Sequence, residues 1–433
     1  MKPVKIGLLG LGTVGGGTVN VLRRNASEIS RRAGRDIQIL RAAARGKCTC
    51  DTTGIPLTED GFEVVNDPDV DIVVELIGGE EPAKQLILTA LANGKHVVTA
   101  NKALIAKHGN EIFAKASEMG LMVAFEPAVA GGIPIIKALR EGLTGNKIEW
   151  VAGIINGTCN FILTEMRDKG REFADVLAEA QAKGYAEADP TFDVEGIDAA
   201  HKLTILASIA FGIPLQFDKV YIEGISGITR IDVAYAEELG YRIKLLGLAR
   251  RTEQGVELRV HPTMIPHRRL IANVDGVMNA VLVKGDAVGP TLYYGAGAGA
   301  EPTASAVVAD IVDVVRTLTS DPENRVPHLA FQPQHITDIP ILSIDDVKTA
   351  YYLRLSAEDK PGVLANVTRI LADHSISIEA ILQKEPDSGD NFVPIIMLTH
   401  ITLERELKAA VSAIEALPTI NKPVKLIRLE TLG

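Results

Sequence analysis

A glycine-rich turn near the start of the chain is the feature that most constrains its fold. The turn, Gly10-Leu11-Gly12-Thr13-Val14-Gly15, directly follows an apolar stretch at residues 4–9 and opens a helical pattern. This order of strand, turn and helix is typical of a nucleotide-binding α/β unit. Gly10 would permit the tight turn, Gly12 would let the backbone approach a pyrophosphate, and Gly15 would let the helix and strand pack closely. The helix N-terminus would supply N–H groups and partial positive charge for the phosphates.

Strands and helices alternate after this turn. Further strands are expected at residues 36–44, 70–76, 96–100 and 121–129. These stretches are continuously apolar, as is typical of parallel strands that are covered on both faces. The fold class is therefore α/β, with a Rossmann-type doubly wound parallel sheet in residues 1–133. A glycine loop that enters a helix at residues 300–318 is expected to complete this dinucleotide-binding domain.

Two further domains are predicted in the rest of the chain. From residue 134, helical patterns precede short strands and hairpins, which indicates an α+β catalytic and dimerisation domain over residues 134–320. Residues 321–348 contain several prolines without clear periodicity and are predicted to be a linker. Residues 349–433 follow the order β-α-β-β-α-β, which is the ferredoxin-like pattern.

The composition excludes some classes of partner. The chain of 433 residues carries 45 Lys and Arg against 55 Asp and Glu, a formal net charge of −10. Nucleic acids and anionic membranes require a basic surface, so we expect neither as a partner. No apolar run is long enough for a membrane span and no signal-peptide pattern opens the chain. The sparse cysteines (Cys48, Cys50 and Cys159) suit a reducing compartment, so a cytoplasmic location is expected.

The end of the second predicted strand bears on the choice of nicotinamide cofactor. An acid at this position would bind the ribose 2′-hydroxyl of NAD. The sequence has no acid there and continues Ala44-Arg45-Gly46-Lys47. Arg45 is placed to meet a 2′-phosphate, which favours NADP, with NAD as the alternative. The plainer interpretation is that Arg45 and Lys47 are solvated loop charges.

Two lysines are candidates for chemistry. Lys102 follows the strand at residues 96–100, at the sheet edge where ligands bind in open α/β folds. Lys202 lies four residues after Asp198, so both share one face of a predicted helix. An exposed ion pair is the plain alternative, but the rest of this helix is apolar, which favours a buried pair that faces a cleft. A lysine whose pKa is lowered by burial and by a neighbouring lysine can give up its proton.

Three other segments have both a functional and a plain interpretation. The loop 184–190 carries carboxylates that could hold a substrate ammonium, or it is a capped helix end followed by a polar turn. The segment 125–133 combines Glu126 with glycine-rich backbone that could present oxygens to a hard cation, or it is a plain loop. Cys159 could be a thiol nucleophile, but a buried structural cysteine is the more ordinary interpretation.

Six segments of the sequence resemble homoserine dehydrogenase, with a C-terminal ACT-type regulatory domain. They are GLGTVG, TANK, EPAVAGGIPII, NGTCNFILTEM, GYAEADPTFDVEGIDAAHKL and GAGAEPTASAVVADI, in this order along the chain. The resemblance covers essentially the whole chain. It implies the interconversion of L-aspartate 4-semialdehyde and L-homoserine with NADPH or NADH, on the path to threonine, methionine and isoleucine, by a homodimer or homotetramer.

The resemblance also implies roles for single residues. Lys202 would donate a proton to the carbonyl oxygen, and Lys102 would assist between cofactor and substrate. Glu187 and Asp198 would hold the polar groups of the substrate, in particular its ammonium. The residues implied to line the cofactor site are Gly10, Gly12, Thr13, Val14, Gly15, Arg45, Lys102, Gly184 and Gly299.

Two further ligands follow from the same resemblance. A sodium ion would be bound by Glu126 and by the backbone carbonyls of Val129, Gly131 and Ile133. An amino-acid effector such as threonine would bind at the loop after the first strand of the C-terminal domain, at Asp359, Gly362, Val363 and Leu364. A bare ferredoxin-like dimerisation module is the alternative. With a regulatory domain, deletion of residues 350–433 is expected to leave an active enzyme that is insensitive to threonine.

Two other functions stay open on the sequence. An aspartate-semialdehyde dehydrogenase would use Cys159 as its nucleophile and would depend on phosphate. A nucleotide-binding amino-acid sensor would use the two lysines only structurally. An assay with homoserine and NADP separates these functions from a homoserine dehydrogenase.

Overall fold

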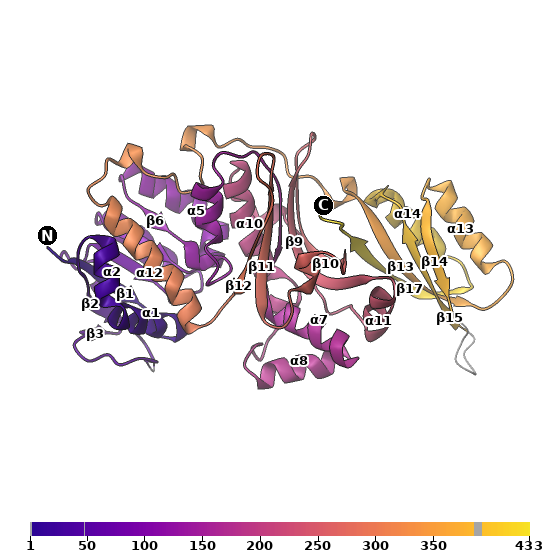
Figure 1. The fold of residues 1–433 in the computed structure, drawn as a ribbon, viewed down its shortest axis with the longest axis horizontal. Helices are drawn as coiled ribbons and strands as arrows, with labels where there is room; N and C mark the ends of the chain where they lie inside the picture. Colours follow the sequence, from indigo (N-terminus) through magenta and orange to yellow (C-terminus); the bar gives the residue numbers. More distant parts are fainter. Residues whose placement is uncertain (1, 47, 385–391) are drawn as a thin grey trace.

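The structure is a computed structural model that describes residues 2–46, 48–384 and 392–433. Three units lie in a row, with the N-terminal unit at one end, a mixed sheet in the middle and the C-terminal unit at the other end (Figure 1). Within the described part of the chain, every helix is too short or too polar to cross a bilayer.

The N-terminal unit contains a six-stranded parallel sheet in the order β3-β2-β1-β4-β5-β6. Its strands are β1 (Val4–Leu9), β2 (Ile37–Ala43), β3 (Leu57–Thr58), β4 (Ile72–Glu75), β5 (His96–Thr99) and β6 (Val123–Ala124). This order confirms the predicted Rossmann-type sheet. The strand expected at residues 121–129 is shorter than predicted, because a 3-10 turn, η1 (Glu126–Ala128), begins directly after it.

Helices cover both faces of this sheet. They are α1 (Thr13–Arg24), α2 (Ala26–Ala33), α3 (Gly61–Val65), α4 (Ala83–Ala92), α5 (Lys102–Glu118) and the returning helix α12 (Ala300–Thr317). Helix α12 lies beside α1 although nearly 300 residues separate them in the chain (Figure 1). A Cβ atom on Gly17 would lie 2.4 Å from the carbonyl oxygen of Ala300, so this close approach requires glycine.

The middle unit is built on an antiparallel sheet. Its strands are β7 (Ile148–Ile154), β9 (Tyr241–Arg251), β10 (Val256–Pro266), β11 (Met278–Gly285) and β12 (Gly289–Ala296), with a short β8 (Tyr221–Ile222) parallel to β10. Its helices are α6 (Ile135–Lys137), the π-helical turn η2 (Ala138–Gly142), α7 (Gly157–Lys169), α8 (Phe173–Ala182), α9 (Thr191–Val194), α10 (Ile197–Phe211) and α11 (Arg230–Glu238). Short 3-10 turns η3 (Phe217–Lys219) and η4 (Leu270–Asn273) complete it.

Helix α10 lies where the first two units meet. It packs on β7, β9 and β10 of the middle sheet and on α5 of the N-terminal unit. A single hydrophobic cluster runs through this contact and includes Leu91, Ile105, Val151 and Ile205. The first two units therefore share a core, and α10 is held from both sides.

The linker contains three 3-10 turns, η5 (Pro322–Asn324), η6 (Pro333–His335) and η7 (Ile344–Asp346), and leads into the C-terminal unit. That unit contains β13 (Lys348–Glu358), α13 (Val363–Asp373), β14 (Ile378–Gln383), β15 (Phe392–Thr399), the short β16 (Thr402–Leu403), α14 (Glu404–Glu415) and β17 (Ile420–Leu429). The four long strands form an antiparallel sheet in the order β17-β13-β15-β14. This arrangement confirms the ferredoxin-like pattern.

The sheets of the middle and C-terminal units are continuous. Strand β17 pairs in parallel with β10 through Thr263–Arg428 and Met264–Leu429. Buried charges cross the same seam: Arg354 of β13 donates to the fully buried Asp232 of α11 at 2.7 Å. Deletion of residues 350–433 would remove this partner of Asp232 and the strand that pairs with β10. The expectation that a truncated chain stays active and insensitive to threonine remains a prediction.

Candidate active site

The glycine turn has the geometry of a phosphate cradle. Gly10 has a φ of +97°, and a Cβ atom there would lie 2.8 Å from the carbonyl oxygen of Leu76. A Cβ atom on Gly15 would lie 2.1 Å from the carbonyl oxygen of Gly10, so helix and strand could not pack so closely with a larger residue. Nothing lies within 4 Å of the corresponding position on Gly12. The approach to the turn is therefore open, and no side chain caps the N-terminus of α1 at Thr13.

A cleft of about 410 Å³ lies over this turn, at the carboxyl ends of β1, β2 and β4. This is the topological switch point where ligands bind in doubly wound sheets. Arg45 is exposed at the rim of the cleft, and its Nε donates to the carbonyl oxygen of Glu59 at 3.3 Å. Lys47 lies outside the described residues.

The other cofactor residues predicted from the sequence are not among the residues that line this cleft. Thr13 and Val14 form the first turn of α1, and Gly299 caps α12 where that helix meets α1. Gly184 lies in the exposed turn after α8, in the middle unit, and is not among the residues that line the cleft. Of the residues predicted to line the cofactor site, Gly10, Gly12 and Arg45 line this cleft, and Thr13 and Val14 directly follow its glycine turn.

The structure joins the two candidate lysines through one carboxylate. Lys102 is the first residue of α5, and its Nζ lies 3.1 Å from Oδ1 of Asp198. Lys202 lies one turn after Asp198 on α10, and its Nζ donates to Oδ2 at 2.7 Å. Asp198 is buried, so this is a shielded cluster rather than an exposed helix ion pair. It forms where the N-terminal and middle units meet.

The charges of this cluster shift the pKa values of its members. Burial by itself would raise the pKa of Asp198, but Lys202 and Lys102 outweigh burial and hold this pKa far below its ordinary value. The charge of Asp198 likewise raises the pKa of Lys102 against the effect of burial. Lys102 therefore keeps its positive charge more firmly than a free lysine does.

Lys202 has a second anchor. Its Nζ also donates to the carbonyl oxygen of Ile155 at 2.7 Å, and its side chain is only 12% exposed. An ammonium has three N–H groups, and among the described residues only Asp198 and Ile155 accept from it. One N–H is therefore left to point at a ligand.

Asp193 also belongs to this cluster, and no pattern in the sequence marks it as a site residue. The side chain of Asn156 donates to Asp193 at 2.7 Å and to Asp198 at 2.9 Å, and so ties the two carboxylates together. Burial, followed by the charge of Asp198, raises the pKa of Asp193. The only signal in the sequence is its place in the segment GYAEADPTFDVEGIDAAHKL, five residues before Asp198. Glu187 of the same segment is exposed, and its charge contributes to the raised pKa of Lys102.

Cys159 does not have the environment of a nucleophile. It is fully buried, and burial raises the pKa of its thiol well above the ordinary value. Its Sγ donates to the carbonyl oxygen of Asp193 at 3.2 Å. The structure therefore favours the interpretation of Cys159 as a structural residue.

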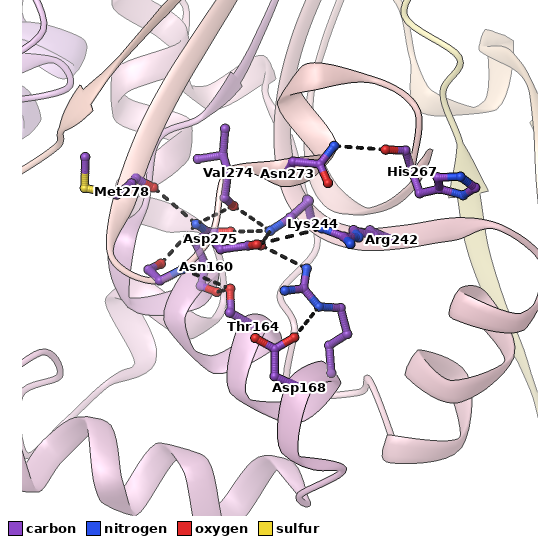
Figure 2. A network of polar contacts seen from close by, with 12 residues as sticks. Asn160, Thr164, Asp168, Arg242, Lys244, His267, Asn273, Val274, Asp275 and Met278 are labelled. Carbon is purple, nitrogen blue, oxygen red and sulfur yellow. Dashed lines mark hydrogen bonds and ion pairs between the residues drawn. The ribbon is translucent and has the colours of Figure 1, made fainter.

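A buried polar network holds α7, whose N-cap is Asn156, against the middle sheet. Figure 2 shows Lys244 of β9 reaching toward oxygens from Asn160, Val274 and Asp275. The distances from Nζ are 3.0, 2.6 and 3.0 Å, and burial lowers the pKa of this lysine to about 8. Asn160 lies one turn after Asn156 on α7. The network therefore fixes the helix that carries the link between Asp193 and Asp198.

The candidate cation loop has one buried carboxylate and free carbonyl oxygens. The two carboxylate oxygens of Glu126 accept from the backbone N–H groups of Ile136 and Lys137 at 2.9 and 2.8 Å. Burial raises the pKa of Glu126 to about 7. Within the described residues, no backbone N–H donates to the carbonyl oxygens of Val129 and Gly131, both of which are buried.

Other observations on this loop are less favourable to a cation. The carbonyl oxygen of Ile133 accepts from the N–H of Ile135 at 2.8 Å. The described residues contain no cluster of three or more His, Cys, Asp or Glu that could hold a metal. Hard cations nevertheless bind mixed sets of carboxylate and carbonyl oxygens. The carbonyl groups of Val129 and Gly131, which accept from no backbone N–H among the described residues, are therefore compatible with a cation.

The candidate effector loop lies between β13 and α13. Asp359 and Gly362 are exposed, and Gly362 opens α13 with a φ of +92°. Val363 is buried in the core of the C-terminal unit, and Leu364 packs partly exposed against the same core. Asp359 and Gly362 are thus the members of the set that can meet a ligand from solution.

Comparison with known proteins gives matches over almost the whole chain. Residues 134–312 match the family model for homoserine dehydrogenase. Residues 10–126 match the model for the NAD binding domain of homoserine dehydrogenase, and residues 351–419 match the ACT domain.

Relatives and solved structures agree with these matches. A homoserine dehydrogenase of Pseudomonas aeruginosa is 68% identical over 434 residues, and the alignment covers 100% of both chains. The crystal structure of a homoserine dehydrogenase from Thiobacillus denitrificans aligns with a TM-score of 0.96 and 70% identity, over 100% of this chain and 99% of that chain. A hyperthermophilic archaeal homoserine dehydrogenase in complex with NADPH aligns with a TM-score of 0.64 and 26% identity, over 74% of this chain and 100% of that chain.

Proposed function

The chain belongs to the homoserine dehydrogenase family of oxidoreductases, which act on a CH–OH group, and from this premise we propose a finer assignment. The enzyme interconverts L-homoserine and L-aspartate 4-semialdehyde, with NADP preferred and NAD as the alternative. The observation that carries this proposal is the cluster of Lys102, Asp198 and Lys202 beside the cofactor-binding unit. We assign residues 1–133 with helix 300–318 to cofactor binding, 134–320 to substrate binding and catalysis, 321–348 to a linker and 349–433 to regulation.

The residues of the cluster suit the two halves of this reaction. The nicotinamide, when bound, supplies the hydride to the aldehyde carbon or accepts it from the alcohol. Lys202 donates its free proton to the carbonyl oxygen during reduction and accepts it back during oxidation. Lys102 adds a second positive charge that stabilises the developing alkoxide. Glu187, Asp198 and also Asp193 provide carboxylates for the substrate ammonium.

The residues of the cleft fit a dinucleotide. Gly12 leaves room for a pyrophosphate, Gly10 and Gly15 permit the tight turn and the close packing of helix and strand, and the first turn of α1 supplies N–H donors. Arg45 at the rim supports a preference for NADP through its charge. The archaeal relative that is in complex with NADPH also supports this preference. Gly184 would contribute only if its turn closes toward the cleft.

Sodium and an amino-acid effector complete the proposal. The donor set for sodium is Glu126 with the carbonyl groups of Val129, Gly131 and Ile133. The orphaned carbonyl groups of Val129 and Gly131 support it. The effector, such as threonine, would bind at Asp359 and Gly362 in the ACT domain. We place the enzyme in threonine, methionine and isoleucine biosynthesis in the cytoplasm, as a homodimer or homotetramer.

One assay tests the main assignment. Purified full-length protein is incubated with L-homoserine and NADP or NAD, and the absorbance of the reduced nicotinamide is followed. We expect turnover without phosphate, and a higher kcat/KM for NADP. Phosphate-dependent oxidation of the semialdehyde would instead indicate an aspartate-semialdehyde dehydrogenase. Binding of nucleotide without turnover would indicate a sensor.

A further inference from the structure

We propose that Arg428, on the last strand of the C-terminal domain, is a positioning residue for the active site. It acts through Glu223 on the segment that carries Asp193 and Asp198. The inference rests on the proposed role of these two carboxylates in substrate binding. It makes the C-terminal domain part of the support of the active site, whether or not an effector is bound.

The first contact in this series is an ion pair across the seam between the two sheets, between the buried Arg428 and the partly exposed Glu223. Arg428 is 3% exposed, and its Nη1 donates to the carboxylate of Glu223 at 2.7 Å. Its Nε donates at 2.8 Å to Glu404 of α14, and its Nη2 donates at 3.1 Å to the hydroxyl of Tyr221. Partners on three sides fix the planar guanidinium, and Glu404 anchors it to the C-terminal domain while it reaches Glu223 of the middle unit.

The second contact links Glu223 to the segment before α10. The N–H of Glu223 donates to the carbonyl oxygen of Val260 on β10 at 2.8 Å. Two residues later, the N–H of Ile225 donates to the carbonyl oxygen of Val194 at 2.8 Å. Between them, a Cβ atom on Gly224 would lie 2.5 Å from that same carbonyl oxygen. The backbone after Glu223 therefore touches Val194 without a gap.

The third link is the backbone itself between Asp193 and Asp198. Val194 directly follows Asp193, and Gly196 opens α10 with a φ of +82°, two residues before Asp198. A Cβ atom on Gly196 would lie 3.2 Å from the side chain of Val260, so this turn also packs tightly on β10. A shift of the backbone at Glu223 is therefore transmitted to both carboxylates, because close-packed interiors transmit strain.

The chain offers variants that separate positioning from folding. The side chain of Glu223 is 33% exposed, and Arg428 keeps Glu404 when Glu223 is removed. The loss of Glu223 therefore leaves no buried charge without a partner. Lys384 and Glu238 form a second ion pair between the same two domains, with 2.6 Å between Nζ and the carboxylate. Glu238 is the last residue of α11 and does not belong to the segment 193–198. Glu238→Ala is the matched control.

The test compares Glu223→Ala, Glu223→Gln and Glu238→Ala in the full-length protein. Glu223→Ala should raise the KM for homoserine about tenfold. This effect is smaller than the roughly hundredfold loss of activity that a misplacement of about 1 Å can cause. The KM for NADP should stay within about twofold, because the cofactor cleft lies in another unit. Glu223→Gln should recover most of the loss, because its amide oxygen still accepts from Arg428. Amide hydrogen exchange at residues 193–198 should become faster in Glu223→Ala and not in Glu238→Ala.

Two results would overturn the proposal. One is that Glu223→Ala matches Glu238→Ala in both the KM for homoserine and the exchange at residues 193–198. The other is a parallel loss for homoserine and NADP with a lowered Tm, which would indicate a general structural role. If the wild-type protein does not turn over homoserine, the proposed function fails, and the hydrogen exchange comparison still decides this inference.

Discussion

The carboxylate of Asp198 gives the two lysines of the candidate active site different degrees of freedom. Lys202 is held by Asp198 and by Ile155, which both belong to the middle unit. Lys102 comes from the N-terminal unit, and Asp198 at 3.1 Å is its one ion-pair partner among the described residues. The direction of Lys202 is therefore fixed within one unit, whereas the position of Lys102 depends on how the cofactor-binding unit sits on α10.

Replacement of Lys202 tests its role as proton donor. We expect Lys202→Ala to lower kcat about a hundredfold to ten-thousandfold, the usual range for a general acid. Cofactor binding should persist, because Lys202 does not line the cleft over the glycine turn. Steady-state kinetics and cofactor titration measure both effects. Lys169→Ala, at an exposed ion pair on α7, is the control, and near-normal turnover of Lys202→Ala would exclude the role.

Replacement of Arg45 tests the preference for NADP. A hydrogen bond to a charged group contributes about 1.5–3 kcal/mol. Arg45→Ala should therefore raise the KM for NADP roughly tenfold to a hundredfold and leave the KM for NAD unchanged. Arg41→Ala on β2, where the arginine pairs with Asp67 at 3.0 Å, is the control. Equal effects of Arg45→Ala on both cofactors would contradict the assignment.

Among the elements, those with a strong local pattern were predictable. The turn after β1 and the continuous apolar strands predicted the parallel sheet, and the order of elements predicted the ferredoxin-like unit. Helix α2 and the two-residue strand β3 were not predicted, because both are short and mostly exposed. The pairing of β10 with β17 has no local signal, since it joins two residue pairs far apart in the chain. Asp193 became a site residue only through its contact with Asn156 in the folded chain.

The loop after β6 gives a prediction about sodium and pH. Burial raises the pKa of Glu126 to about 7 in the folded protein. The folded state therefore binds this proton more tightly than the unfolded state. The free energy of unfolding falls as the pH rises from the ordinary pKa of this group toward 7. A bound cation favours the ionised form and offsets this cost. The Tm should therefore be higher in sodium than in choline at about pH 8, and this difference should vanish toward about pH 5. Thermal unfolding at equal ionic strength measures the difference.

Two variants serve as controls for this measurement. Glu126→Gln should abolish the difference between sodium and choline. Glu118→Gln, at the exposed end of α5, should retain it. A gain in Tm that is the same at both pH values, or that survives Glu126→Gln, would show that sodium acts elsewhere.

At the scale of the whole molecule, the C-terminal domain is joined to the catalytic domain by more than its linker. The two domains share an 11-stranded sheet, and Arg354 and Arg428 both reach carboxylates of the middle unit. An effector bound to the C-terminal domain can therefore reach the active site through packed contacts. Point substitutions, rather than truncation, are the suitable test of regulation.

We expect threonine to inhibit the full-length enzyme. Asp359→Ala should abolish inhibition, because this exposed carboxylate would hold the effector ammonium. Glu223→Ala should still bind threonine, with weaker inhibition, because it breaks one of the contacts between the two domains, the ion pair with Arg428. Inhibition curves and calorimetric titration with threonine separate the two effects. Asp373→Ala at the end of α13 is the control, and unchanged inhibition of Asp359→Ala would place the effector elsewhere.

The parallel pairing of β17 with β10 also has a consequence for biosynthesis. The chain leaves the ribosome from its N-terminus, so β10 emerges about 150 residues before β17. During this interval β8 covers only part of the outer edge of β10, and the backbone at Thr263 and Met264 stays open. An open strand edge readily pairs with other nascent chains. The catalytic sheet is therefore completed, and protected from aggregation, only after the C-terminal domain has been translated.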